Sequence, residues 1–258
     1  MMRTRFIIIC AVIAMVVCIS AHAQTDRARE LVSDAQNAIE RGQPAAAIDD
    51  LKAALQTSPD WPAAHSRLAV AYQMMDMDAA ALQQYLRLQR MADTMEGTIS
   101  GPGSSPLGRQ LITQCEAYMT LLLNDMRATK GMTPLYPLPK MVSPARGHSR
   151  EMRDEGYFSH TSPNEERKTV GDRFGSVFGF QPRCIAENLA RRWRSGQGIS
   201  LSLAHIAESQ ADLLESPGHR ENILREEVTH VAIGIAINEE GDYWVTQMFA
   251  DLTDHQNY

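Results

Sequence analysis

The sequence is poor in cysteine and lacks the short motifs of two common hydrolase classes. It has four cysteines in 258 residues, and two of them, Cys10 and Cys18, lie in an apolar segment near the N-terminus. The other two, Cys115 and Cys184, are too few to make a zinc site by themselves. In an exported chain they predict either one disulfide or two free buried thiols. Neither G-x-S-x-G nor H-E-x-x-H occurs, which excludes a nucleophile elbow and a helical zinc-protease motif.

The chain also has less positive than negative charge. Lys and Arg together number 25 against 31 Asp and Glu, for a net charge of −6. Residues 1–23 contain Arg3 and Arg5 but no acid, so their removal makes the remainder more acidic. An acidic surface repels phosphate backbones and anionic lipid headgroups. We therefore expect no nucleic-acid partner.

One long hydrophobic run is present, at residues 6–20, between two arginines and the triplet Ala21-His22-Ala23. This order is typical of a secretory signal peptide with a small-residue cleavage site. The run is shorter than the roughly 20 residues that a membrane-spanning helix needs. The sequence predicts that residues 1–23 are a signal peptide, that the protein is exported to a periplasm or secreted, and that no stable membrane span remains after cleavage. The alternative is an uncleaved segment that tethers the protein to the membrane.

Residues 24–97 repeat with a period of 34. The units are Ala28–Trp61 and Pro62–Met95, and small residues recur in register, as in Ala35 and Ala69. Small residues at helical spacing let helices pack closely, and the pattern resembles the tetratricopeptide repeat. It predicts an all-α, TPR-like module that binds a protein or peptide partner; a plain bundle of four antiparallel helices is the alternative. Because stable arrays usually need roughly three units, we expect the pair to lean on the C-terminal domain or on a partner.

A linker rich in Gly, Pro and Ser is predicted at residues 98–108, so the last domain spans 109–258. The runs 230–237 and 243–251 flank a Gly-containing turn and predict a β-hairpin. Helices beside a small antiparallel sheet indicate the α+β class. The helices are expected at 109–131, 143–156, 169–180 and 202–217, an extended segment at 133–141, a strand or loop at 183–193, and a turn at Ser216-Pro217-Gly218.

Three short motifs place a histidine or an acid beside Gly, Pro or Asn: "YFSHTSP" with His160, "AENLA" with Glu187 and "SPGHRENIL" with His219. In this order, with "NDMRATKGMTPL" before them and the hairpin after them, they resemble the CAP superfamily of cysteine-rich secretory, antigen 5 and pathogenesis-related proteins. The match is to its bacterial, SCP-like branch. The resemblance covers about residues 110–252. It implies an α-β-α sandwich whose cleft is lined by two histidines and two glutamates, and it assigns His160, Glu187 and His219 to three of these positions.

The resemblance leaves the fourth position open, because Ser216 stands where the second glutamate belongs. His148 either supports the cleft from behind or packs on its own helix. Asn222 is expected to brace the loop around His219, since its amide can bond nearby backbone. The candidates to replace the missing acid lie on the preceding helix: Glu215, Asp212 and Glu208.

Two imidazoles and a carboxylate suit more than one chemistry. His160, His219 and Glu187 could hold a divalent cation, with zinc as the natural candidate, or form a pH-sensitive hydrogen-bond cluster. The resemblance also implies a small apolar ligand or a cell-envelope component. We expect an exported binding or adaptor protein rather than an enzyme. The alternatives are a secreted hydrolase or protease that uses these residues, with Ser159 or Ser162 as nucleophile, and a purely structural envelope scaffold.

Overall fold

The computed structural model describes residues 26–97, 100–193 and 201–255. The predicted signal peptide at 1–23 lies outside these ranges. Within them, no helix is both long enough and apolar enough to cross a membrane.

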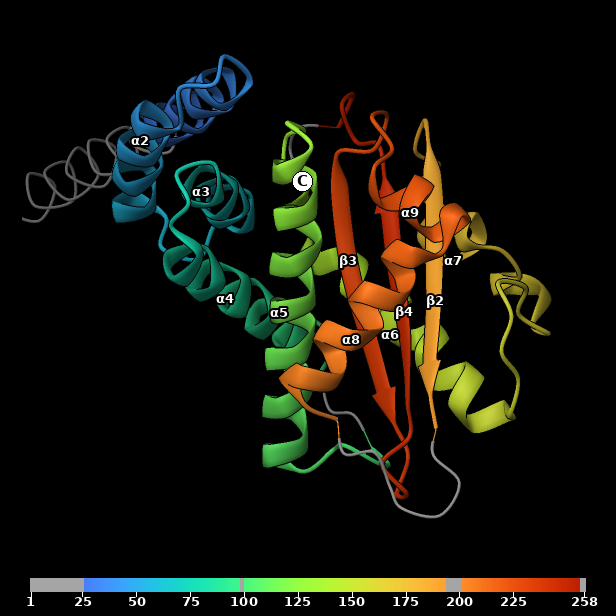
Figure 1. Cartoon of the computed structure of the whole chain (residues 1–258). Coiled ribbons are helices and arrows are strands. Elements are labelled where there is room, and N and C mark those ends of the chain that lie inside the picture. The colour runs from blue at the N-terminus through green and yellow to red at the C-terminus, as the bar shows by residue number, and fades with distance from the viewer. Residues whose placement is uncertain (1–25, 98–99, 194–200, 256–258) are drawn as a thin grey trace, which may run out of the picture.

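The N-terminal module consists of two helical hairpins that follow one another along the chain (Figure 1). Gly42 and Asp76, 34 residues apart, occupy the turns of the two hairpins, and both have a left-handed backbone, with φ of 69° and 55°. The helical character of this segment is confirmed, while its assignment to the tetratricopeptide class stays a prediction. The helices are 26–40, α2 (Pro44–Thr57), α3 (Pro62–Gln73) and α4 (Asp78–Glu96).

The C-terminal domain is built on a four-stranded sheet with the order β1-β3-β4-β2. The predicted hairpin is present as β3 (His230–Ile237) and β4 (Tyr243–Ala250), and β2 (Ile185–Arg192) pairs antiparallel with β4. β1 (Tyr136–Pro137) runs parallel to β3, so the sheet is mixed rather than purely antiparallel. β2 is an edge strand of this sheet.

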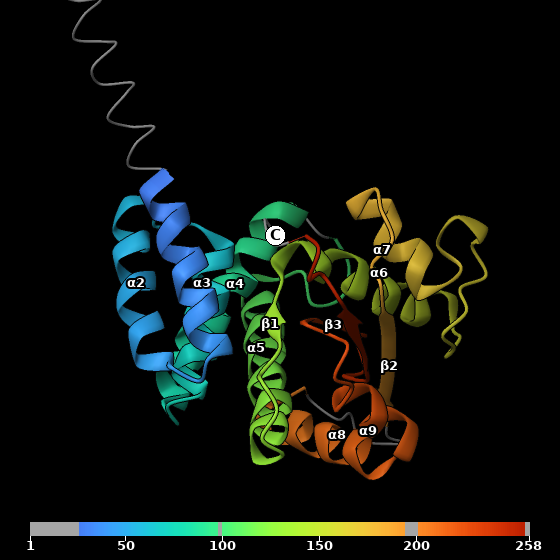
Figure 2. The same ribbon diagram turned by 90° about the horizontal axis from the view of Figure 1, so that it is seen from above.

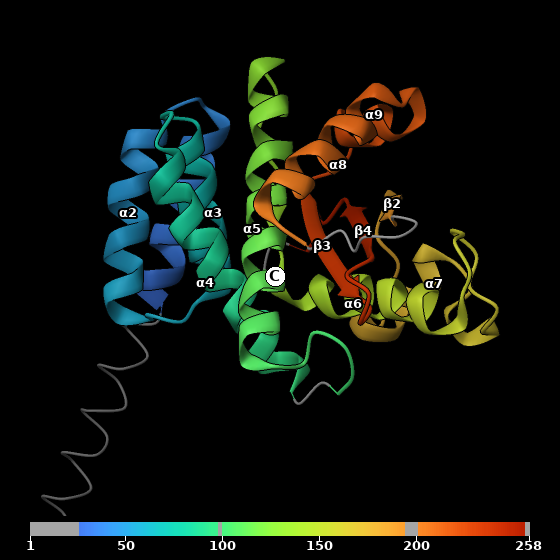
Figure 3. The ribbon, with the colours of Figure 1, turned by 60° about the horizontal axis from the view of Figure 1, so that its bottom comes forward.

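Helices cover both faces of the sheet. α6 (Pro139–Glu155) and α7 (Val170–Phe178) lie on one face, and α5 (Pro106–Thr129), α8 (Leu203–Glu215) and α9 (Pro217–Ile223) lie on the other, as Figures 2 and 3 show. The layers are thus helix, sheet and helix. The predicted α+β class and α-β-α sandwich are confirmed.

Three helices begin at a proline that the sequence analysis had placed in a linker, an extended segment or a turn. α5 begins at Pro106, inside the predicted linker 98–108, α6 at Pro139 and α9 at Pro217. Proline suits the first turn of a helix, because its φ is already helical and an N–H at that position would have no intrahelical partner. The chain does break at Ser216, between α8 and α9, as predicted. Pro217 and Gly218 belong to α9, however, so His219 lies inside a short helix rather than after a turn.

Cys115 and Cys184 are free cysteines, so the structure has the second of the two predicted alternatives and not the disulfide. Cys115 is buried in α5, and burial raises the pKa of its thiol to about 12. Cys184 lies just before β2, and its Sγ is 3.9 Å from Nη1 of Arg225. Both side chains pack into the same apolar cluster as separate thiols, and a thiol with so high a pKa is a poor nucleophile for exchange.

α6 lies very close to the sheet at Gly234. A Cβ atom on this glycine would come within 2.1 Å of the backbone nitrogen of Arg146, so a larger residue does not fit beneath the helix. The Oγ of Ser149 donates to the carbonyl oxygen of Gly234 at 2.8 Å and lies 2.8 Å from Oγ1 of Thr246. These contacts fix the height and the rotation of α6, which carries His148.

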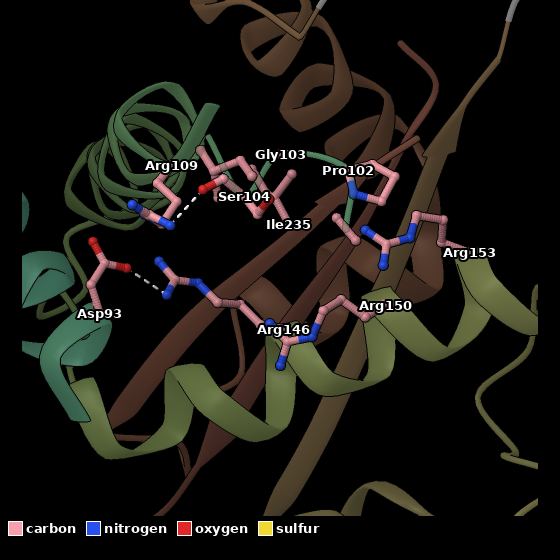
Figure 4. Close-up of a pocket in the computed structure, with 11 residues that line it drawn as sticks. Asp93, Pro102, Gly103, Ser104, Arg109, Arg146, Arg150, Arg153 and Ile235 are labelled. Atoms are coloured by element: carbon pink, nitrogen blue, oxygen red, sulfur yellow. Dashed lines mark hydrogen bonds and ion pairs between the residues drawn. The ribbon is translucent and has the colours of Figure 1, made fainter. Parts of the chain in front are cut away.

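The helical module joins the C-terminal domain through an ion-pair network centred on Arg146. Its guanidinium lies 2.6 Å from Asp93 and 3.0 Å from Glu96, both on α4, and 2.5 Å from Glu116 on α5. Figure 4 shows Asp93 facing Arg146 beside a pocket lined by further arginines. Apolar side chains of α5 also belong to the core of the helical module. The pair of repeat units therefore leans on its own C-terminal domain.

We predict that Arg146→Met destabilises the protein by about 3–5 kcal/mol, because Glu116 is then left buried without its cation. The matched control is Arg87→Met, which removes an exposed pair with Asp60 and should cost less than about 1 kcal/mol. Urea unfolding of the two variants measures the difference. Equal midpoints and slopes for both would show that the network contributes no more than a surface pair.

His230 gives a pH dependence of stability. It is buried, and burial lowers its pKa from 6.5 to about 3, with a further lowering from the charge of Arg67 and an opposing effect of Asp251. Between these two pH values the unfolded chain binds one more proton than the folded chain, so the free energy of unfolding falls as pH falls, by about 1.4 kcal/mol per pH unit from this group. His230→Asn should reduce the slope of unfolding free energy against pH by this amount between pH 6 and pH 4. Identical slopes in variant and wild type would contradict the assignment.

Candidate functional site

The edge strand β2 directs its alternate side chains to the two faces of the sheet. Glu187 lies on the face covered by α6 and α7, and its carboxylate is almost fully buried, with 2% of the side chain exposed. Its Oε1 lies 2.9 Å from Nδ1 of His160, whose side chain is 58% exposed. A carboxylate accepts hydrogen bonds only, so the imidazole donates through Nδ1 and leaves Nε2 as the acceptor of the neutral ring. The sequence prediction paired these two residues, and the structure places them in direct contact.

Arg173 is the member of the site that the sequence analysis missed. Its Nη2 donates to Oε2 of Glu187 at 2.6 Å and to the carbonyl oxygen of His160 at 3.3 Å. The guanidinium is buried on α7, which begins with a capping box formed by Thr169 and Asp172. No signal in the sequence marks this residue, because its partner Glu187 lies 14 residues further along the chain.

His219 reaches the same edge from the opposite layer. The Nδ2 of Asn188 donates to the carbonyl oxygen of His219 at 3.0 Å, and Nδ2 of Asn222 donates to the carbonyl oxygen of Glu187 at 3.2 Å and to Oδ1 of Asn188 at 2.9 Å. Asn222 thus ties α9 to β2. Burial lowers the pKa of His219, and the charge of His160 lowers it further.

None of the three acids proposed to replace the second glutamate joins this cluster. Glu208 and Asp212 are exposed on α8 and pair with Arg192 at 2.6 and 2.7 Å. Glu215 is exposed at the last position of α8, and within the described residues its side chain forms no hydrogen bond or ion pair. Ser216 is the residue between α8 and α9. The helix therefore turns these carboxylates away from Glu187.

His148 lies behind the His160 segment rather than beside it. It is buried on α6, its Nε2 lies 3.0 Å from the carbonyl oxygen of Ser159, and the same nitrogen is 3.9 Å from Oε1 of Glu187. Burial is the main cause that lowers the pKa of His148, Glu187 raises this pKa and Arg173 lowers it. Of the two roles expected for His148, the geometry favours support of the site.

The cluster does not fit the predicted three-ligand metal site. Both oxygens of Glu187 are engaged, one by His160 and one by the buried guanidinium of Arg173, which already supplies the positive charge. In the ranges that the structure describes, no group of three or more His, Cys, Asp or Glu side chains is arranged to hold a metal ion.

The two serines considered as nucleophiles are used in local structure. The Oγ of Ser162 donates to Oε1 of Glu151 at 2.8 Å and accepts the N–H of Asn164 at 3.0 Å, and the residue is buried. The Oγ of Ser159 accepts the N–H of Thr161 at 3.0 Å. Neither hydroxyl forms a hydrogen bond to a histidine within the described residues.

The fold and the site together define a class of protein: an α-β-α sandwich with an imidazole–carboxylate pair at the edge strand of its sheet. The chain belongs to the cysteine-rich secretory protein family, CAP, whose model matches residues 121–249. The matched segment begins within α5 and ends one residue before the end of β4, so it contains β1, β2, β3 and nearly all of β4, together with His160, Glu187 and His219. The predicted family membership is confirmed.

Several known proteins are similar to the chain. The uncharacterized protein YkwD of Bacillus subtilis (strain 168) is 28% identical over 158 residues, which cover 60% of this chain and 52% of YkwD. The uncharacterized membrane protein YlbC of the same organism is 25% identical over 127 residues, or 49% of this chain and 33% of YlbC. An extracellular protein containing an SCP domain from Bacillus anthracis str. Ames has 30% identity and a TM-score of 0.46, covering 58% of this chain and 45% of that one. The chain thus spans about half the length of these proteins, or less.

We predict that Arg173→Met changes both stability and the titration of His148. Loss of the guanidinium leaves Glu187 buried without its cation, at a cost of about 3 kcal/mol, and removes a charge that lowers the pKa of His148, so this pKa rises. Imidazole NMR signals followed from pH 4 to pH 8 measure the shift. Arg192→Met is the control. Arg192 lies on β2, as Glu187 does, but pairs with acids of α8 on the other face of the sheet, so this variant should leave the titration of His148 unchanged. Coincident His148 titrations in the two variants would contradict the prediction.

Proposed function

We propose that the protein is an exported binding protein and that its histidine site, defined as His160, Glu187 and His219, holds a small ligand. The observation that supports this most is the state of His160: one ring nitrogen is bonded to a buried carboxylate, while more than half of the side chain is open to solvent. A ring oriented in this way can recognise a ligand without first losing rotational freedom.

The hydrogen-bond pattern limits the chemistry of the ligand. Because Nδ1 of His160 donates to Glu187, Nε2 is an acceptor when the ring is neutral, and it pairs with a hydroxyl or amide donor. His219 adds a second, half-buried imidazole. Phe158 lies two positions before His160 and is 47% exposed, so its ring offers apolar surface near the site. The ligand class that these groups suit is a small molecule with a hydroxyl or amide group and an apolar part, including such groups of a cell-envelope component.

Export is part of this proposal. It is supported by the signal-peptide pattern at residues 1–23 and by membership of a family described as secretory. Both proposed locations, a periplasm and the outside of the cell, are oxidising compartments.

The helical module is proposed to contact a protein or peptide partner. In α3 all residues from Ala63 to Gln73 are buried, and the Nε2 of Gln73 donates to Oδ1 of Asp125 on α5 at 2.7 Å. The surface open to a partner is therefore mainly that of helix 26–40 and α2, because α3 is buried and α4 carries the two acids that pair with Arg146.

The test is a ligand-observed NMR screen of the mature protein against small hydroxyl and amide compounds. We expect binders whose dissociation constants rise at least about tenfold in the double variant His160→Ala, His219→Ala, since each loses a hydrogen bond at the site. His205→Ala on α8 removes an imidazole outside the site and is the matched control. Unchanged affinity in the double variant would place any bound compound elsewhere and overturn the proposal.

A second candidate function is hydrolysis by an activated water molecule. It is favoured by the pair of His160 and Glu187, because an imidazole oriented by a buried carboxylate is the arrangement of a general base. Mass spectrometry of a peptide library incubated with wild type and with His160→Ala tests it: cleavage by wild type alone supports it, and intact peptides in both reject it. A chain that binds no compound and cleaves no peptide would leave the structural-scaffold hypothesis.

A further inference from the structure

The segment that carries His160 is held on both sides by two side chains of α6. On one side, Nε2 of His148 lies 3.0 Å from the carbonyl oxygen of Ser159. On the other side, the Oγ of Ser162 donates to Oε1 of Glu151 at 2.8 Å. Ser159 and Ser162 flank His160 by one and two residues, so these bonds restrain the backbone on either side of it.

Glu151 is built into this position. Its side chain is only 3% exposed, and it follows His148 by three residues, so the two lie on the same face of α6. The Oε1 atom also accepts a hydrogen bond from Nε of Arg167 at 2.9 Å. The other carboxylate oxygen, Oε2, is buried and lies 3.6 Å from Nδ1 of His148. Glu151 thus faces both Ser162 and His148.

The proton positions on His148 follow from its contacts. A carbonyl oxygen can only accept, so Nε2 carries the proton that goes to Ser159, and Nδ1 is the acceptor of the neutral ring. The hydroxyl of Tyr157 lies 3.5 Å from Nδ1 and supplies a donor on that side. The ring therefore stands in one orientation between the Ser159 carbonyl and the Tyr157–Glu151 side.

We propose that His148 and Glu151 form the positioning pair of the histidine site: together they hold the segment from Ser159 to Ser162, and so present the imidazole of His160 to Glu187. This deepens the proposed function and rests on it for the use of the site. Glu151 is thus a second carboxylate near the site. It lies on α6, whereas the acids predicted for this role lie on α8. Gly234 and Ser149 fix α6 on the sheet, so the pair is anchored to the same sheet that carries Glu187.

The proposal predicts a different rate of amide exchange for Glu151→Leu than for Glu151→Gln, and Ser162→Ala tests the same hydrogen bond. Glu151→Leu removes the acceptor for Ser162, so the amides of residues 159–162 should exchange with solvent about tenfold faster. Glu151→Gln keeps an acceptor oxygen for Ser162 and adds an N–H that can donate to Nδ1 of His148, so it should restore slow exchange and keep the Nε2–H tautomer of His148. Ser162→Ala removes only one hydroxyl and tests the same bond if Glu151→Leu does not fold.

Hydrogen exchange and the ¹⁵N shifts of the imidazoles are the measurements, made on the protein without ligand. Lys168→Met is the control: it removes an exposed ion pair with Glu165 in the same segment but does not touch Glu151, and it should leave exchange at residues 159–162 unchanged. If Glu151→Gln behaves like Glu151→Leu, or if Ser162→Ala exchanges like wild type, the positioning role is overturned. Since no ligand enters the experiment, this failure is separate from failure of the ligand screen.

Discussion

The buried carboxylate of Glu187 is the constraint on which the site depends. An ionised carboxylate with 2% exposure is unfavourable unless it is paired, and the chain pairs it twice, with Arg173 and with His160. These partners come from a helix and from a loop, and Glu187 itself from the edge strand. One charge thus fixes how α7, the His160 segment and β2 meet. The exposed part of His160 is a consequence, because only one of its nitrogens is needed inside.

The interface around Arg146 is also held by a buried charge, here between the helical module and the C-terminal domain. The cation comes from α6 and its acids from α4 and α5, so the helical module and the CAP domain share both charge and apolar core. α6 in turn rests on Gly234 and carries His148 and Glu151. The helical module is consequently connected, through one helix, to the residues behind the histidine site.

The sequence allowed correct prediction of what is encoded locally. Two β-rich runs around a glycine turn identified the hairpin of β3 and β4, and the order of the motifs around His160, Glu187 and His219 identified the family and the sandwich. Features that depend on partners distant in sequence could not be predicted in this way. Arg173 lies between two recognised motifs, and its role depends on its contact with Glu187. The spacing of Glu208, Asp212 and Glu215 suggested that they lie near the site, but spacing alone does not determine which side of α8 faces the sheet. Pro106, Pro139 and Pro217 were taken as breaks, because the same fixed φ that ends one helix also starts another.

The shared core of α4, α5 and α6 also determines how the chain can be divided for study. A fragment cut in the Gly- and Ser-rich stretch before α5 would expose the apolar stripe of Ala117 and Leu121 to water. It would also strip Arg146 of two of its three acids. The smallest stable unit that retains the histidine site is therefore expected to include the helical module, rather than to begin at the family domain's own boundary.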